Sequence, residues 1–256
     1  MPRGECIMLA NLTWPEASAV INGAVVLLPV GAIEAHGPHL PLDTDVIIAC
    51  ETARRTCPRI PGPAVVLPEI SYGVSYVGTC FPGTTPVPPD ALTRMINEIL
   101  VTSLDAGAIG AVIVNAHLEP AHIQALADAA ERATHATMKP VAFPDLRQER
   151  WARRLSTEFV AGMRHAGAYE TSLVLAAKPE AVRREFLSGL EPVLIDLPAA
   201  LRSGARTFAD AGSSLGYFGN PCEASAEEGE HLFDELAQIM IDALAEAEQD
   251  TETPEP

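Results

Sequence analysis

Continuous apolar runs and helix-like repeats alternate along the first half of the chain. Three runs have the length of a strand: AVVLLPV (24–30), AVVLP (64–68) and AVIVN (111–115). PVAF (140–143) is a shorter fourth candidate. Strands that are apolar on both faces are typical of the centre of a parallel sheet covered by helices on each side. The pattern therefore predicts four parallel strands.

The segments between these runs have the spacing of amphipathic helices. Apolar residues recur at intervals of three and four over 45–57, 89–107 and 120–136, and again over about 224–247. Pro120 suits the first turn of the third of these helices. Alternating strands and helices predict an α/β fold with a largely parallel sheet. FPGTTPVPP (81–89) is interpreted as a rigid loop inside the domain, so we predict one domain over residues 1–248.

Composition narrows the class of protein. The chain has 256 residues and a formal net charge of −17, which argues against binding to nucleic acids or anionic membranes. We find neither a secretory signal at the N-terminus nor an apolar run long enough to span a membrane. Five cysteines without a CxxC pair favour reduced thiols in a cytoplasmic protein. Residues 249–256, within an acidic C-terminal segment, are predicted to be a disordered tail.

Two polar clusters follow predicted strands directly. GAIEAHGPHLPLDTD (31–45) follows the first, and NAHLEP (115–120) follows the third. Ligands of open parallel sheets bind at the carboxyl ends of the strands, so both clusters should face one rim. The imidazoles and carboxylates that they offer are Glu34, His36, Asp45, His117 and Glu119. This set suits zinc, manganese or iron(II), and five ligands suit two ions bridged by a carboxylate that together activate a water.

Each of these residues also has an ordinary structural interpretation. Asp45 or Thr44 could cap the helix that begins there, and Glu119 could favour a helix start. Glu34 and His36 could be loop surface, and His117 a hydrogen-bonded histidine at a strand end. His39 and Asp43 are assigned turn and N-cap-like roles, and His122 is expected on the surface.

A third cluster, RHAGAYETSLVL (164–175), contains His165 and Glu170 near the start of an apolar helix. A histidine close to its reference pKa can accept and return a proton at neutral pH, and a carboxylate nearby could orient it. Thr171 and Ser172 could instead mark this stretch as a helix cap. The pattern alone leaves both interpretations open.

Five motifs in order resemble those of the creatininase (creatinine amidohydrolase) family. They are LPVGAIEAHGPHLPLDTD, YGVSYVGTCFPGTT, VNAHLEP, HAGAYETSLVL and GYFGNPCEASAEEGEHLF, and they span about residues 24–240. The resemblance implies a three-layer α/β/α sandwich, assembled as a homohexamer, with a metal-dependent hydrolase activity on a small-molecule substrate. The implied cofactors are two divalent ions, zinc or manganese, with iron as an alternative.

The resemblance also implies residue roles. Glu34, Asp45 and His117 would hold one ion, and His36, the shared Asp45 and Glu119 the second. His165 falls on the proton-shuttling histidine of the family and Glu170 on its accompanying carboxylate. Ser75 and Leu118 fall on positions near the substrate.

Departures from the family pattern argue against creatinine as the substrate. Ala161 and Gly162 stand where creatininase has a tryptophan and an aspartate, and Leu118 and Pro120 replace a tyrosine and an asparagine. Trp151 is a candidate to close the pocket instead. We therefore expect hydrolysis of a C–N bond in a small, cyclic amide. The alternatives are a formamide or carbon–carbon (cyclic ketone) hydrolase, and a non-catalytic, metal-stabilised oligomeric binding protein.

Overall fold

The computed structural model describes residues 6–252 and contains a five-stranded sheet whose strands are all parallel. The strand order is β1-β3-β2-β4-β5. The strands are β1 (Ile7–Met8), β2 (Val25–Val30), β3 (Ala64–Val66), β4 (Gly110–Asn115) and β5 (Val141–Ala142). β2 and β4 pair along six residues each, from Val25 opposite Gly110 to Val30 opposite Asn115.

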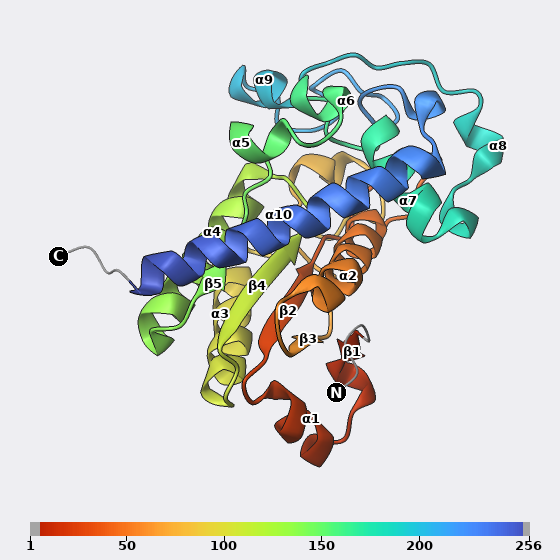
Figure 1. Ribbon diagram of the computed structural model, residues 1–256. Coiled ribbons are helices and arrows are strands. Elements are labelled where there is room, and N and C mark those ends of the chain that lie inside the picture. Colours follow the sequence, from red (N-terminus) through yellow and green to blue (C-terminus); the bar gives the residue numbers. More distant parts are fainter. Residues whose placement is uncertain (1–5, 253–256) are drawn as a thin grey trace.

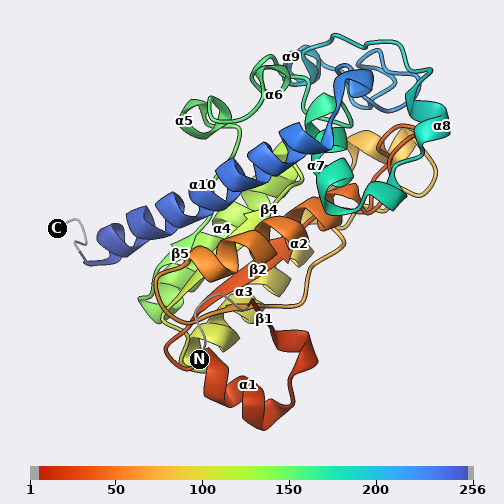
Figure 2. The ribbon, with the colours of Figure 1, turned by 45° about the vertical axis from the view of Figure 1, so that its right-hand side comes forward.

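Helices cover both faces of this sheet (Figures 1 and 2). One face carries α2 (Thr44–Thr56), α7 (Ala168–Ala177) and the long α10 (Ala226–Glu252). The other carries α3 (Pro89–Asp105) and α4 (Pro120–Thr137). Alternate residues of β2 enter the two cores, Val25 and Leu27 on the α2 side and Val26 and Leu28 on the α3 side. Both faces of β2 are buried, which explains its uninterrupted apolar sequence.

Short helices build the two ends of the molecule. α1 precedes β2 at the amino ends of the strands, whereas α5, α6, α8 and α9 gather near their carboxyl ends (Figure 1). Their bounds are α1 Trp14–Ile21, α5 Glu149–Ala152, α6 Thr157–Val160, α8 Arg184–Leu187 and α9 Leu197–Arg202.

The three-layer α/β/α sandwich expected from the sequence is confirmed. All four predicted strands form, and so do the four predicted helices. The sequence did not predict β1 or α1, which are too short to produce a clear periodicity. No helix among residues 6–252 is long and apolar enough to cross a bilayer.

The prediction of a disordered tail from residue 249 is wrong in part, because α10 continues to Glu252. Glutamate and glutamine are good helix formers, and the Thr251 hydroxyl donates back to the Ala247 carbonyl at 3.0 Å. Residues 253–256 lie outside the described part of the chain.

The strand order reverses beside β2. The chain leaves β2 for β3 on one side and then crosses to β4 on the other. The loops that follow β2 and β4 therefore emerge next to each other at the carboxyl edge of the sheet, where α/β proteins of this type bind ligands.

Candidate metal centre

The loop after β2 and the first turn of α2 bring three polar side chains into the interior. Glu34, His36 and Asp45 are each about 1 % exposed. The loop can turn back so tightly because Gly31 lies against the start of α2, where a Cβ would approach the Val46 nitrogen to 2.6 Å. Buried carboxylates are costly unless they meet compensating charge or hydrogen bonds, so three such groups need a common explanation.

Asp45 does not serve as a helix cap. It lies in the first turn of α2, where the N-cap residue Asp43 makes no side-chain capping bond, and the Thr44 hydroxyl donates to the Pro41 carbonyl. The Asp45 carboxylate instead spans two imidazoles, with Oδ1 3.2 Å from His36 Nε2 and Oδ2 3.1 Å from His117 Nδ1. This geometry favours the ligand interpretation over the capping one.

Backbone carbonyls determine which imidazole nitrogens carry protons. His117 Nε2 lies 2.8 Å from the Val74 carbonyl oxygen, and His36 Nδ1 lies 3.0 Å from the Glu34 carbonyl oxygen. A carbonyl can only accept, so these nitrogens are the donors and the opposite nitrogens present lone pairs. An imidazole whose far nitrogen is bonded to a carbonyl is the usual arrangement of a metal-binding histidine.

The free lone pairs converge on carboxylate oxygens. His117 Nδ1 lies 3.2 Å from Glu34 Oε2 as well as close to Asp45, and His36 Nε2 lies 3.6 Å from Glu170 Oε2. Glu34 Oε2, His36 Nε2 and Asp45 Oδ2 are buried without a hydrogen-bond partner among the described residues. Acceptors facing acceptors repel, so positive charge is required between them. Divalent ions fit this donor set.

The same demand for positive charge affects the pKa values of the groups themselves. Burial alone lowers the pKa of His36, but the carboxylates of Asp45, Glu170 and Glu34 together outweigh burial and raise this pKa to about 10. Burial alone raises the pKa of Asp45, but His36 and His117 hold it below the ordinary value. Protons and metal ions therefore compete for the same lone pairs, as expected of a metal site.

The structure groups the candidate ligands differently from the predicted partition. Among residues 6–252, three sets have ligand atoms within 4.8 Å of one another: Glu34, His117 and Glu119; His36, Asp45 and Glu170; and Glu34, His36 and His165. Glu119 thus lies with Glu34 rather than with His36, because the Val77 amide donates to Glu119 Oε2 at 3.0 Å. Glu170 takes the place beside His36 that the prediction gave to Glu119.

Two residues have roles that the sequence did not indicate. Ser75, predicted to contact substrate, is fully buried and donates to Glu34 Oε1 at 2.7 Å. His122, expected on the surface, is also fully buried and bonds the Asn115 side chain at 2.9 Å. Asn115 in turn accepts a hydrogen bond from the His117 amide through Oδ1 and donates one to the His117 carbonyl through Nδ2. Ser75 therefore holds the candidate ligand Glu34, and His122 acts through Asn115 on the candidate ligand His117.

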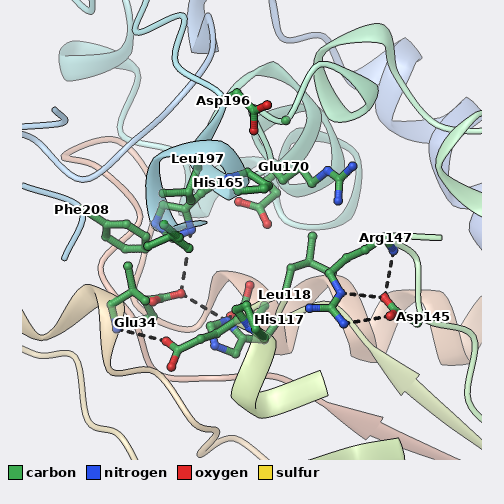
Figure 3. A pocket seen from close by; sticks show the side chains of 18 of the residues that line it. Glu34, His117, Leu118, Asp145, Arg147, His165, Glu170, Asp196, Leu197 and Phe208 are labelled. Carbon is green, nitrogen blue, oxygen red and sulfur yellow. Dashed lines mark hydrogen bonds and ion pairs between the residues drawn. The ribbon is translucent and has the colours of Figure 1, made fainter. Parts of the chain in front are cut away.

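His165 stands at the edge of the pocket beside the candidate ligands (Figure 3). Its Nε2 donates to the Ala35 carbonyl at 2.8 Å, which leaves Nδ1 facing Glu34 Oε2 at 3.8 Å. Burial, helped by the positive charge of His36, lowers the pKa of His165 to about 4. Phe208 stacks on the ring with centroids 4.1 Å apart.

The predicted pairing of His165 with Glu170 does not occur as an ion pair among the described residues. Glu170 lies in the first turn of α7, and its Oε2 accepts from the Ala166 amide at 2.6 Å while facing His36. Burial raises the pKa of Glu170 to about 8. The carboxylate beside His165 is Glu34.

A cavity of about 710 Å³ opens above these residues. Leu118 lines it. Trp151 does not line it, because its side chain packs into the core between sheet and helices. The outer wall comes instead from α9 and the segment around it, and Asp196 fills the space beside Gly162, where a Cβ would lie 2.7 Å from its Cγ.

Comparison with known proteins identifies the family of the chain. Residues 10–244 match the family described as "Creatininase: Creatinine amidohydrolase". The chain belongs to the creatininase family. It is 34 % identical over 229 residues to a mycofactocin precursor peptide peptidase of Mycolicibacterium smegmatis, covering 86 % of this chain and 84 % of the relative. It is 28 % identical over 266 residues to a creatinine amidohydrolase of Pseudomonas putida, covering 94 % and 97 %.

Solved creatininases share the fold. A creatininase mutant of Zn–Zn type superposes with a TM-score of 0.77 at 25 % identity, over 96 % of this chain and 99 % of that one. The creatininase-family resemblance drawn from five motifs is thereby confirmed. The motifs did not reveal Phe208, Asp196 and Arg202, which line the cavity here. They lie outside any strand or clear helical repeat, so only the folded chain brings them to the site.

Proposed function

We propose that this creatininase-family hydrolase uses two divalent ions, zinc or manganese, to cleave an amide C–N bond with an activated water. The observation that carries the proposal is the convergence of three buried acceptor atoms, on Glu34, His36 and Asp45, that have no hydrogen-bond partner among residues 6–252. Asp45 faces one imidazole with each carboxylate oxygen, which suits a bridging ligand. Glu34 and His117 would complete one ion's ligands, and His36 and Glu170 the other's, with Glu119 beside the first.

Two bound ions would lower the pKa of a shared water and polarise the amide carbonyl. The chain contributes a rigid setting for this chemistry. The Val74 and Glu34 carbonyls hold the His117 and His36 rings in position, and the Ser75 hydroxyl holds the Glu34 carboxylate. Ligands held in this way need little rearrangement during reaction, which favours catalysis.

His165 is proposed to carry the proton from the attacking water to the leaving nitrogen. Its Nδ1 faces the ligand cluster, and its Nε2 is anchored to the Ala35 carbonyl. Because its pKa lies near 4, the ring is neutral at pH 7 and, once protonated, is a stronger acid than an ordinary imidazolium. Phe208 stacks on one face of the ring and helps to fix its orientation.

The substrate proposed from the sequence is a small, cyclic amide. A second candidate is the end of a peptide chain. A cavity of about 710 Å³ has the size of sites that enclose drug-sized molecules, and thus holds more than a single small ring. The relative at 34 % identity is a peptide peptidase, which supports the same alternative.

Elemental analysis of the purified protein, with metal counted per chain, tests the core of the proposal. We expect two ions per chain in the wild type and loss of both in Asp45→Asn, because a bridging ligand serves each ion. The matched control is Asp90→Asn, which removes an exposed carboxylate on α3. A wild-type protein that binds no divalent metal, or an Asp45→Asn variant that keeps both ions, would refute it.

Product analysis of the metal-loaded enzyme separates the reaction types. Hydrolysis of an amide releases an amine and a carboxylate, whereas cleavage of a cyclic ketone releases no amine. Formamide hydrolysis is recognised by the formate it releases. Full metal occupancy without turnover of cyclic amides, formamides, ketones or peptides would favour the binding protein.

A further inference from the structure

The outer half of the cavity carries charged groups that the metal centre does not use. Three arginines line it, Arg147, Arg164 and Arg202, together with two aspartates, Asp145 and Asp196. The whole chain has a net charge of −17, so an excess of guanidinium groups at the mouth of the cavity runs against the general charge of the protein. The three arginines differ in whether a carboxylate of the described chain forms an ion pair with them.

Arg147 already has its partner. Its Nε donates to Asp145 Oδ1 and its Nη2 to Asp145 Oδ2, both at 2.9 Å (Figure 3). This bidentate pair occupies the guanidinium and neutralises the charge. Arg147 is consequently not available for a ligand.

Arg164 is held in place but not neutralised. Its Nε donates to the Phe159 carbonyl at 2.8 Å, and its guanidinium lies over the Phe159 ring at 4.7 Å from the centroid. No carboxylate of residues 6–252 forms an ion pair with it, and its two terminal nitrogens make no hydrogen bond within that range. Asp196 is engaged elsewhere, since its Oδ1 accepts from the Ala199 amide at 2.9 Å as the N-cap of α9.

Arg202 adds a second uncompensated charge. It ends α9 and forms no ion pair within the described chain. Burial lowers the pKa of Arg164. The Asp196 and Asp145 carboxylates oppose this decrease without forming an ion pair with Arg164, whereas the charges of Arg147 and Arg202 add to it. Two guanidinium groups that repel each other at the wall of one cavity are stabilised by an anion between or beside them.

We propose that Arg164, assisted by Arg202, binds a carboxylate of the substrate, so that the enzyme acts on amides that bear a free carboxylate. This inference rests on the proposed function, whose site it extends. A planar guanidinium with its Nε already anchored presents its remaining donors in a fixed direction, which suits carboxylate oxygens. Arg164 directly precedes His165 in the chain, and both side chains line the cavity. A carboxylate on Arg164 would hold the neighbouring amide beside the proton carrier.

Matched pairs of probes test this directly on the metal-loaded protein. The first pair is N-acetyl-trialanine and its C-terminal amide, and the second is 5-oxoproline and its carboxamide. Binding is measured by isothermal titration calorimetry and hydrolysis by mass spectrometry. We expect the acid of at least one pair to bind more tightly than its amide, and the pair that does so distinguishes a peptide terminus from a small cyclic acid.

Substitution of Arg164 separates guanidinium binding from direct binding of the carboxylate to metal. Arg164→Ala should weaken binding of the preferred acid roughly 10- to 100-fold, as expected when a charge-assisted hydrogen bond is lost, and should leave binding of the amide almost unchanged. Arg164→Lys should recover part of the preference. Arg94→Gln, which removes an exposed guanidinium on α3, should keep the ratio of acid to amide.

The results distinguish this inference from the proposed function. Equal binding of acid and amide by the wild type, no binding of either acid, or an undiminished preference in an Arg164→Ala/Arg202→Ala double variant would overturn the carboxylate site. A preference that depends on Arg164 without hydrolysis of any probe would support the carboxylate site and count against the hydrolase. Hydrolysis without any preference for the acid would support the hydrolase and overturn the carboxylate site.

Discussion

Removal of the Ser75 hydroxyl tests whether its hydrogen bond orients the proposed metal ligand Glu34. Ser75 Oγ donates to Glu34 Oε1 at 2.7 Å, and both side chains are buried. Glu34 Oε2 has no hydrogen-bond partner in the described part of the chain and faces His117 Nδ1. Ser75→Ala removes a single oxygen and leaves the proposed ligand without the bond that fixes its orientation.

The size of the effect follows from this bond. A hydrogen bond to a charged group contributes about 1.5–3 kcal/mol when the group left behind is buried. Loss of a hydrogen bond that orients a metal ligand typically weakens metal binding by about 10- to 100-fold, which corresponds to roughly 1.4–2.8 kcal/mol. The two estimates agree, so we expect the affinity for the more weakly held ion to fall within this range.

The affinity is measured by competition with a chromophoric zinc chelator, for the wild type and the variant at the same pH. Ser103→Ala is the matched control, because this hydroxyl donates to the Ile99 carbonyl within α3 and should not affect the metal. Unchanged or tighter zinc binding by Ser75→Ala would refute a positioning role for Ser75. Equal losses in both serine variants would point to a general effect on stability instead.

Three further predictions test other parts of the structure. His165→Ala should keep both ions and lower turnover by about 10²- to 10⁴-fold, measured by metal analysis and single-turnover kinetics; undiminished turnover would exclude proton transfer by this residue. Burial and the charge of His36 lower the pKa of His39 from 6.5 to about 4, so the folded state resists protonation of this ring. As pH falls from about 6.5 to 4, the wild type should therefore lose up to about 3 kcal/mol of unfolding free energy relative to His39→Gln, in urea titrations; parallel pH profiles would contradict this. Gly229→Ala should destabilise despite the better helix propensity of alanine, which is about 1 kcal/mol, because its Cβ would lie 2.6 Å from the carbonyl carbon of Ser172 in α7 and overpacking costs about 1–3 kcal/mol; a raised melting temperature would contradict it.

The fold was predictable because the hydrophobic patterns that indicate it lie within short segments of the sequence. The apolar run over Val25–Val30 is buried along its whole length, and such a run needs helices on both faces wherever it occurs. The helices on those faces keep the three- and four-residue spacing of their buried side chains. Short elements such as α1 gave no comparable signal, since eight residues with no buried side chain leave almost no periodicity.

The candidate ligands were predictable for a related reason. Glu34, His36 and Asp45 follow one strand and His117 and Glu119 another, and parallel strands end at one edge. The five family motifs added two further candidate residues for the same site, His165 and Glu170. Sequence order thus identified which segments meet at the rim of the sheet.

The pairing of atoms within that rim was decided by the tertiary structure alone. Carbonyls of Val74 and Ala35 select the nitrogen that each histidine presents, and an amide of the loop over 71–88 draws Glu119 to the side of Glu34. The wall of the cavity comes from α9 and Phe208, far along the chain from the ligands they face. The sequence by itself determined which chemistry reaches the edge of the sheet, because strand polarity is a local property. Packing between distant segments determined what each group touches, because a side chain's hydrogen-bond partner is set by distance in space.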